Sequence, residues 1–322
     1  MINMLNTDKL SECRESGIER NQALYLSRLQ GDSVYELLHM ANRTRAKFRG
    51  KKIDLCSIVN AKSGSCPEDC SFCAQSLSNS TDTDTYPLLK KDKVLNAAAS
   101  AKDNKVRHFC IVTSGKKISE KELDETCEII SGIKMLGLLP CATLGLLDDV
   151  SLKRLKDAGL SRYHHNLETS EAYFSEICTT HTYREKIRTI SGAKAAGLSI
   201  CSGGIFGLGE SWEDRIDMAF ALKDIGVDSV PVNFLTPVTG TPLENRETIN
   251  PIEALKIIAI YRLILPLSEI RVCGGREITL RDLNNMIFMA GADGLLVGNY
   301  LTTPGRNPLK DLQMIRDMEM EF

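Results

Sequence analysis

Ile53-Asp-Leu-Cys-Ser-Ile-Val59 is followed, after a short connection, by Cys66-Pro-Glu-Asp-Cys70-Ser-Phe-Cys73. The first run is short and largely apolar, which is typical of a buried strand in a parallel sheet. The second run is a loop with three cysteines, which have three and then two residues between them. Thiolates at this spacing can hold three corners of a 4Fe-4S cluster and leave the remaining iron open for a substrate. The alternatives are a structural zinc site or a redox pair of Cys70 and Cys73, but no second Cys-x-x-Cys hook or His pair lies nearby in the sequence.

Short apolar runs alternate with amphipathic helix candidates along the rest of the chain, as in a parallel sheet covered by helices. The eight strand candidates are Ile53–Val59, Arg107–Thr113, Leu139–Leu144, Ser161–Leu167, Ser199–Phe206, Ser229–Leu235, Glu269–Cys273 and Gly294–Val297. Helix caps are expected at Ser119 and Ser211, and helix ends at Gly137, Gly159, Gly197 and Gly226. This pattern predicts an α/β protein with a closed (β/α)8 barrel of the TIM type. A doubly wound open sheet is the alternative, because strand counts from one sequence err easily.

The first part of the chain does not share this alternation. We expect residues 1–50 to form an N-terminal helical extension, in which Val34, Leu37, Leu38 and Ala41 mark an apolar face. Residues 51–322 are expected to form the barrel as a single domain, since no linker composition interrupts them.

Composition and charge narrow the class of protein. The chain has 322 residues, of which 43% are hydrophobic and 25% charged, and its net charge is -2. A nearly neutral chain argues against nucleic acid or an anionic membrane as a partner. No segment has the apolar length that spans a bilayer, and the N-terminus has no signal-peptide pattern, so we expect a cytoplasmic protein. Eleven cysteines in a reducing compartment indicate metal binding rather than a disulfide framework.

The barrel prediction places the other unusual residues. Active sites of (β/α)8 barrels lie at the C-terminal ends of the strands, where the Cys66–Cys73 loop is expected. Because strand side chains alternate, His164, Asn166 and Glu168 are expected to share one face of the fourth strand. Polar groups that point into a barrel need partners, and a bound substrate is one. Mutual hydrogen bonding or contact with water near the mouth is the other interpretation of this column.

The residues around the three cysteines carry a family resemblance. Asn60-Ala-Lys-Ser-Gly-Ser-Cys66-Pro-Glu-Asp-Cys70-Ser-Phe-Cys73-Ala-Gln-Ser resembles biotin synthase, a family of the radical S-adenosylmethionine (SAM) superfamily. The resemblance extends from about residue 33 to Met314. It implies that Cys66, Cys70 and Cys73 hold a 4Fe-4S cluster. It also implies that SAM binds the open iron and is cleaved to a 5′-deoxyadenosyl radical.

The resemblance also implies roles for single residues. Tyr163-His-His-Asn-Leu-Glu168 is similar to Tyr-Asn-His-Asn-Leu-Asp in biotin synthases. Asn166 and Asn233 match residues that contact dethiobiotin, and Glu168 matches an Asp that hydrogen-bonds the ribose of SAM. His164 replaces an Asn, so a substrate contact is only an expectation there. Lys186 stands where the family commonly has Arg, and we expect its charge near the cofactor carboxylate.

A glycine-rich loop follows the fifth strand candidate. The resemblance assigns it to the SAM side of the barrel, with contacts from Gly203, Gly204, Gly207 and Gly209. Closely spaced glycines let the backbone approach a ligand, although the spacing is not a dinucleotide fingerprint.

A second group of cysteines is spread over the strands. Cys110, Cys141 and Cys201 match the three cysteines that hold an auxiliary 2Fe-2S cluster in biotin synthases, and Arg271 matches its arginine ligand. Cys273 is often serine in the family, so the fourth ligand is Arg271 or Cys273. Four thiolates also suit a four-iron cluster. The alternative is that these are small buried hydrophobic residues.

We expect the remaining cysteines to serve packing or to lie at the surface; they are Cys13, Cys56, Cys127 and Cys178.

The resemblance implies a sulfurtransferase that converts dethiobiotin to biotin, with sulfur from the auxiliary cluster. It further implies an electron donor such as flavodoxin or ferredoxin, and a homodimer. Two other classes stay open at this point. One is a radical SAM enzyme of the hydrogenase-maturation or methylornithine type, and the other is a non-enzymatic iron-sulfur carrier.

Overall fold

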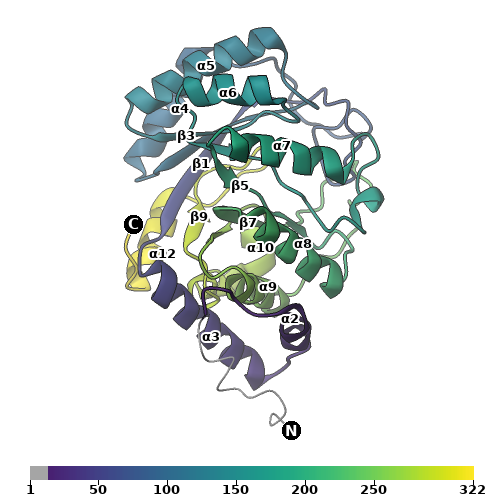
Figure 1. Ribbon diagram of the computed structural model, residues 1–322, viewed down its shortest axis with the longest axis vertical. Coiled ribbons are helices and arrows are strands. Elements are labelled where there is room, and N and C mark those ends of the chain that lie inside the picture. Colours follow the sequence, from purple (N-terminus) through teal and green to yellow (C-terminus); the bar gives the residue numbers. More distant parts are fainter. Residues whose placement is uncertain (1–13) are drawn as a thin grey trace.

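Parallel strands close into a barrel in the computed structural model, which describes residues 14–322 (Figure 1). The strands are β1 (Asp54–Lys62), β2 (His108–Thr113), β3 (Leu139–Thr143), β4 (Arg162–His164), β5 (Ser199–Cys201), β6 (Gly204–Phe206), β7 (Ser229–Phe234), β8 (Glu269–Val272) and β9 (Gly294–Leu296). β5 and β6 are two parts of one barrel strand, because β5 pairs with β4 and both parts pair with β7. The barrel therefore has eight strands in sequence order. The closed-barrel prediction is confirmed, and the open sheet is excluded.

Helices follow the strands and cover the barrel (Figure 1). They are α2 (Arg20–Ser27), α3 (Asp32–Arg49), α4 (Lys91–Asp103), α5 (Glu120–Met135), α6 (Asp149–Asp157), α7 (Tyr183–Ala195), α8 (Trp212–Ile225), α9 (Pro251–Ile264), α10 (Arg276–Leu280), α11 (Met286–Met289) and α12 (Pro308–Asp317), with short 3-10 turns at Phe174–Glu176 and Arg281–Leu283. No helix in the described range 14–322 is long and apolar enough to cross a membrane.

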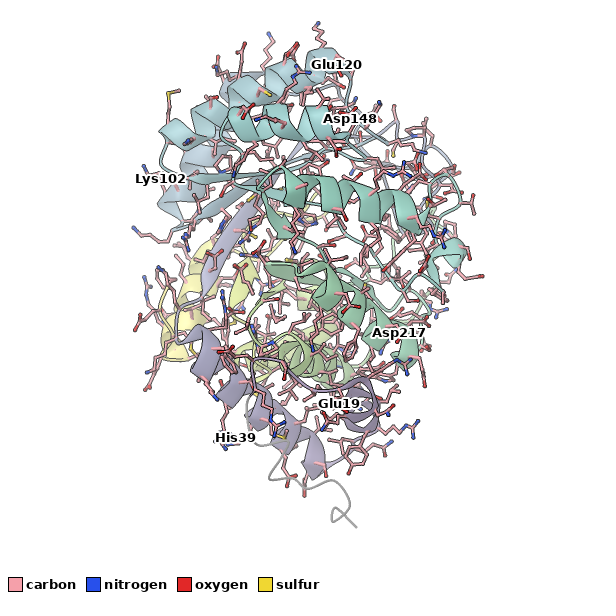
Figure 2. The ribbon with its side chains drawn as sticks, in the orientation of Figure 1. Glu19, His39, Lys102, Glu120, Asp148 and Asp217 are labelled. Atoms are coloured by element: carbon pink, nitrogen blue, oxygen red, sulfur yellow. The ribbon has the colours of Figure 1, made fainter. Side chains whose placement is uncertain are left out.

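The expected helix caps are present. Ser119 accepts a hydrogen bond from the Glu122 amide (3.3 Å), and the Glu122 carboxylate accepts one from the Ser119 amide (2.8 Å). A cap of this kind stabilises a helix by about 1 kcal/mol. Ser211 caps α8 in the same way, and Asp148 caps α6 (Figure 2). The glycines predicted to end helices all have positive φ, which a residue without Cβ adopts without strain.

α2 and α3 cover the outer side of α9 (Figure 1). The predicted apolar face of α3 is buried. Arg20 on α2 forms an ion pair with Asp217 on α8 (2.6 Å; Figure 2), and Lys256 on α9 donates to the Ser27 carbonyl (2.6 Å). The segment before the barrel is therefore docked onto it. Residues 1–13, which include Cys13, lie outside the described residues.

The fourth strand ends three residues earlier than predicted, whereas the ends of β3, β7, β8 and β9 differ by only one residue. We expected the fourth strand to reach Leu167, but β4 ends at His164. The Leu167 and Glu168 amides both donate to the Gly203 carbonyl, and Glu168 has φ +75°. The chain therefore turns at the barrel mouth, and strict alternation of side chains stops there. As a result His165, expected on the opposite face, lines the same cavity as His164.

Candidate functional site

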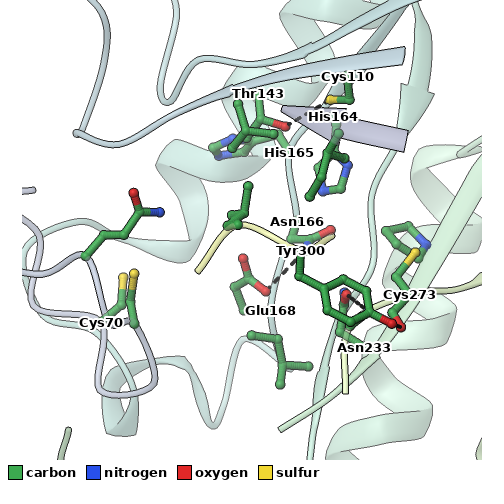
Figure 3. Close-up of a pocket in the computed structure, with 18 of the residues that line it drawn as sticks. Cys70, Cys110, Thr143, His164, His165, Asn166, Glu168, Asn233, Cys273 and Tyr300 are labelled. Carbon is green, nitrogen blue, oxygen red and sulfur yellow. Dashed lines mark hydrogen bonds between the residues drawn. The ribbon is translucent and has the colours of Figure 1, made fainter. Parts of the chain in front are cut away.

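One cavity of about 440 Å³ runs from the barrel interior to the loops that follow the strands. Its wall includes the cysteines of the loop after β1 and those of the strands. Figure 3 shows Cys70 on one side of this cavity and Cys273 on the other, with Asn166, Glu168 and Tyr300 between them. The position at the C-terminal ends of the strands is the one expected for the active site of a (β/α)8 barrel.

The loop with Cys66, Cys70 and Cys73 is held by its own backbone. The Cys73 amide donates to the Cys70 carbonyl (3.1 Å), and the Asn79 side chain donates to the carbonyls of Cys70 (3.2 Å) and Cys73 (2.8 Å). Burial raises the pKa of the Cys73 thiol to about 11, while the amides of Gln75 and Ser76 donate toward it and lower the pKa. A bound cation favours the thiolate instead. Three cysteines of one loop that line the same cavity, with amide donors at Cys73, fit a 4Fe-4S cluster.

A second set of thiols lies inside the barrel. Cys110, Cys141, Cys201 and Cys273 are each at most 5% exposed, and all four line the cavity. Cys110 and Cys141 are direct register partners on β2 and β3. The structure thus brings together the four cysteines that the sequence placed on separate strands. Several soft sulfur donors around one space fit an iron-sulfur cluster better than isolated packing residues do.

The Arg271 guanidinium forms ion pairs with two carboxylates. Its Nη2 donates to Asp54 (2.6 Å) and to Glu269, and its Nη1 donates to the Asp54 and Leu295 carbonyls (3.1 and 3.3 Å). Burial by itself would lower the pKa of this guanidinium, but the charges around it raise the pKa well above the usual value. The Cys273 thiol donates a long hydrogen bond to the Arg271 carbonyl (3.7 Å) and, among the described residues, forms no ion pair. In this geometry the thiol is easier to recruit as a metal ligand than the paired guanidinium.

Cys56 was missed as a site residue. It lies on β1, lines the same cavity, and packs with Cys273 and Leu296. Burial raises the pKa of its thiol to about 12. The alternation of side chains along β1 could have indicated this position. Cys56, Ile58 and Asn60 occupy every second position of the strand and therefore share one face.

The polar column predicted on the fourth strand lines the cavity. Asn166 is its centre: its side-chain N donates to Glu168 (3.3 Å), its side-chain O accepts from the Gly203 amide (3.2 Å), and its carbonyl accepts from Lys186 Nζ (3.1 Å). Burial raises the pKa of the Glu168 carboxyl, and the charge of Lys186 acts against this shift. His164 stands at the end of β4 on the same wall. These residues form a half-buried face with hydrogen-bond donors, acceptors and both signs of charge.

Asn233 comes from the opposite side of the barrel, on β7. Its amide N donates to the Gly204 carbonyl (3.1 Å), and its amide O accepts from the Gly274 amide (3.0 Å). Because an amide O has two lone pairs and the NH₂ group two hydrogens, one of each stays available to a ligand in the cavity.

The glycine loop lies behind the cavity wall. A Cβ on Gly203 would be 2.1 Å from the Pro231 carbonyl oxygen, and one on Gly204 would be 2.4 Å from the Glu168 carbonyl oxygen. The amides of Gly207 and Gly209 donate to Glu210 (2.9 and 3.0 Å). None of these four glycines belongs to the cavity lining, so they shape the wall through close backbone approach.

Residues 177–181, which precede α7, form hydrogen bonds with the cysteine loop. The Ser71 amide donates to the Ile177 carbonyl (2.9 Å), and the Thr179 amide donates to Asp69 (2.9 Å). The hydrogen bond from Cys70 lowers the pKa of the Cys178 thiol to about 5, although burial acts in the opposite direction. Cys178, expected in packing or at the surface, instead faces the cysteine loop through a contact between residues 108 positions apart.

Comparisons with known proteins agree with this geometry. Residues 62–222 match the model of the radical SAM superfamily, and residues 231–321 match the biotin and thiamin synthesis associated domain. The chain is 51% identical to a biotin synthase from Thermodesulfovibrio yellowstonii, over 92% of this chain and 93% of the relative. It is 50% identical to a biotin synthase from Heliobacterium modesticaldum, over 94% and 93%. The chain belongs to the biotin synthase family.

Solved structures share the fold of this biotin synthase family member. A methylornithine synthase has a TM-score of 0.83 at 19% identity, covering 98% of this chain and 96% of its own. A hydrogenase maturase from Carboxydothermus hydrogenoformans has a TM-score of 0.82 at 19% identity, covering 97% and 77%. At such identities the likeness concerns the barrel alone. The far higher identity to biotin synthases favours that family over the two sister types.

Proposed function

We propose that this protein is a biotin synthase that inserts one sulfur atom into dethiobiotin. The observation that carries the proposal is the single cavity with the Cys66–Cys73 loop at one end, the barrel cysteines at the other, and the polar column between them (Figure 3). A substrate on that column lies between the two sets of thiols. A carrier that only hands on clusters has no need of such a face.

When bound, the 4Fe-4S cluster and SAM supply the 5′-deoxyadenosyl radical, and the auxiliary cluster supplies the sulfur. Glu168 accepts the ribose hydroxyls of SAM, and Lys186 faces the carboxylate of its methionyl part. Gly203, Gly204, Gly207 and Gly209 set the backbone of this wall. Asn166 and Asn233 orient the ureido ring of dethiobiotin, because an amide both donates and accepts, and His164 lies beside them. The enclosed cavity keeps the reacting carbon near sulfur and away from water.

The auxiliary cluster in this proposal is held by Cys110, Cys141, Cys201 and Cys273, and it is larger than 2Fe-2S. Support comes from Arg271, whose guanidinium is occupied by Asp54 and Glu269 and so is not free to ligate. Cys273→Ser tests the assignment. We expect a loss of iron per chain and an altered auxiliary Mössbauer spectrum, and unchanged values would leave Arg271 as the fourth ligand of a 2Fe-2S cluster.

The proposal includes the wider setting of the enzyme. Flavodoxin or ferredoxin supplies the electron, the chain acts as a homodimer, and the cytoplasm keeps the thiols reduced. The proposed division is an N-terminal extension up to residue 50, which is helical in its described part 14–50, and one barrel domain over residues 51–322. The docking of α2 and α3 on the barrel supports this division.

The deciding experiment is mass spectrometry of the products formed by anaerobically reconstituted protein with dethiobiotin, SAM and a strong reductant. We expect biotin, with about two 5′-deoxyadenosine molecules per biotin because each of two C–H bonds uses one radical. Deoxyadenosine without biotin, with the auxiliary cluster full, would move the substrate assignment to a sister enzyme. Absence of both products would favour a carrier.

A further inference from the structure

Cys178 lies in the connection between the 3-10 turn at Phe174–Glu176 and α7, where it faces the cysteine loop. Its Sγ is 3.8 Å from the Cys70 Sγ, 3.3 Å from His181 Nδ1 and 3.8 Å from His181 Nε2. One donor atom from each of these three residues lies within 4.8 Å of the others. Cys178 and His181 are 5% and 8% exposed. Two sulfurs and an imidazole therefore converge in a protected place.

The distances match a tetrahedral metal site. With metal–sulfur bonds of about 2.3 Å and metal–nitrogen bonds of about 2.0 Å, tetrahedral geometry puts two sulfurs about 3.8 Å apart and sulfur and nitrogen about 3.6 Å apart. The two cysteine sulfurs are at 3.8 Å, and Cys178 is at 3.8 Å from His181 Nε2. Two of the three edges thus match such a tetrahedron, and the third pair, Cys70 and His181, lies within 4.8 Å.

The surroundings of His181 have the arrangement of a metal-binding histidine. Its Nδ1 contacts the Glu68 carboxylate, which also accepts from the Thr180 hydroxyl (2.9 Å). A carboxylate on one ring nitrogen fixes the ring and presents the other nitrogen to a metal. Asp69 Oδ1 lies 3.2 Å from the Cys178 sulfur and accepts from the Thr179 and Thr180 amides (2.9 and 3.2 Å), so it anchors the segment that carries Cys178.

We propose that Cys70, Cys178 and His181 bind one divalent transition-metal ion, Zn²⁺ or Fe²⁺, in the chain without its 4Fe-4S cluster. Two thiolates and one imidazole are a donor set for either ion, with water in the fourth position. Cys70 also belongs to the cluster loop, so the single ion and the cluster exclude one another. Ferrous iron in this site is the first iron at the cluster loop, whereas zinc blocks Cys70 until it leaves.

The test uses the full-length, reduced, cluster-free protein and Co²⁺ as the probe, since thiolate-bound tetrahedral cobalt has strong visible absorption. The barrel cysteines also bind cobalt, so variants are compared with the wild type. We expect Cys178→Ser and His181→Gln each to lose one equivalent of tetrahedral cobalt. Cys127→Ser, on the half-buried face of α5, should keep it. Glu68→Gln should weaken this equivalent by about 10- to 100-fold, as removal of an outer-shell carboxylate does.

Cys73→Ser separates this site from the cluster loop alone. It removes a cluster ligand but none of the three proposed donors, so the equivalent should remain. Loss of the equivalent in Cys73→Ser together with its survival in Cys178→Ser would overturn the proposal and place the ion on the loop. Circular dichroism of each variant shows whether a loss of cobalt binding reflects misfolding. The proposal also requires that Cys178→Ser and His181→Gln both lose the same equivalent of cobalt.

A second measurement follows cluster loading rather than turnover. Zn²⁺ added before iron and sulfide should delay the rise of 4Fe-4S absorption in the wild type and in Cys127→Ser. The delay should disappear in Cys178→Ser. An equal delay in all three proteins would contradict competition at Cys70. Neither measurement involves dethiobiotin, so both outcomes are independent of the proposed reaction.

Discussion

Replacement of Glu168 tests the proposed SAM contact of this site most directly. Its carboxylate is half-buried on the cavity wall and within the protein is contacted by the Asn166 side chain at a long 3.3 Å. The carboxylate is therefore available to accept hydrogen bonds from a ribose. Glu168→Gln keeps the size and one acceptor oxygen but loses the charge, whereas Glu168→Ala removes both. The positive φ of this residue is equally awkward for all three side chains, so backbone strain cancels in the comparison.

The magnitude follows from the kind of bond. A hydrogen bond to a charged group contributes about 1.5–3 kcal/mol, which corresponds to roughly 10- to 150-fold in affinity. We expect Glu168→Gln near the lower end of this range and Glu168→Ala near the upper end, in the dissociation constant of SAM. We expect the substitutions to weaken SAM binding and not to slow the chemical step, because the carboxylate is proposed to contact the ribose and not the reacting carbon.

Equilibrium dialysis with labelled SAM on the cluster-loaded, non-reduced protein measures this constant without turnover. Glu171→Gln is the matched control, since Glu171 lies three residues further along and its side chain is 62% exposed beside Arg184. We expect the control to bind SAM as the wild type does. A change of less than about threefold in Glu168→Ala would refute the assignment of the ribose contact, because one charged hydrogen bond contributes more than that.

Three further outcomes are expected. Burial raises the pKa of Glu168, and a carboxylate accepts hydrogen bonds from two ribose hydroxyls only when it is deprotonated. SAM affinity should therefore fall as the pH drops through this raised pKa, and the pH dependence of SAM binding should be flatter in Glu168→Gln. Asp311 and Arg276 form an ion pair in which both side chains are 0% exposed, so Asp311→Ala should lower the free energy of unfolding by about 3–5 kcal/mol in urea titrations of cluster-free protein. Asp157→Ala, which breaks the exposed pair with Lys153, should lower it by about 0.5 kcal/mol or less. Gly203→Ala should lower the free energy of unfolding by about 1–3 kcal/mol, because the added Cβ clashes with the Pro231 carbonyl. In the same urea assay Ser202→Ala, which removes a buried hydroxyl without a hydrogen-bond partner among the described residues, should be neutral or stabilising.

Local pattern was enough to predict the barrel and the cysteine loop. Strand runs, capping serines and terminal glycines are short-range signals, and each of the eight predicted runs contains a barrel strand, although β4 ends early and the fifth run is split into β5 and β6. The register that joins Cys110 to Cys141 also follows from pattern, because parallel strands of a barrel bring like positions together. Alternation failed only where regular pairing stops, at the turn after His164.

The missing features depend on contacts between distant parts of the chain. Cys178 and His181 meet Cys70 and Glu68 across more than a hundred residues, through a connection that has neither helix nor strand periodicity. The pairing of Arg271 with Asp54 is of the same kind. A sequence shows which residue types such segments carry, but the side on which a loop folds back is decided by tertiary hydrogen bonds.

The cavity needs both matched parts of the chain. The radical SAM part, residues 62–222, carries the cysteine loop, Cys110, Cys141, Cys201 and the polar column. The part from 231 to 321 carries Asn233, Arg271 and Cys273, and its strands β7, β8 and β9 close the barrel against β5 and β1. Without these strands the face around Asn166 and Glu168 would open to water. Residues 231–321 therefore supply both Cys273, opposite the cysteine loop, and part of the wall that encloses the cavity. In the proposed reaction the closed barrel would hold the substrate between the two sets of thiols and away from water.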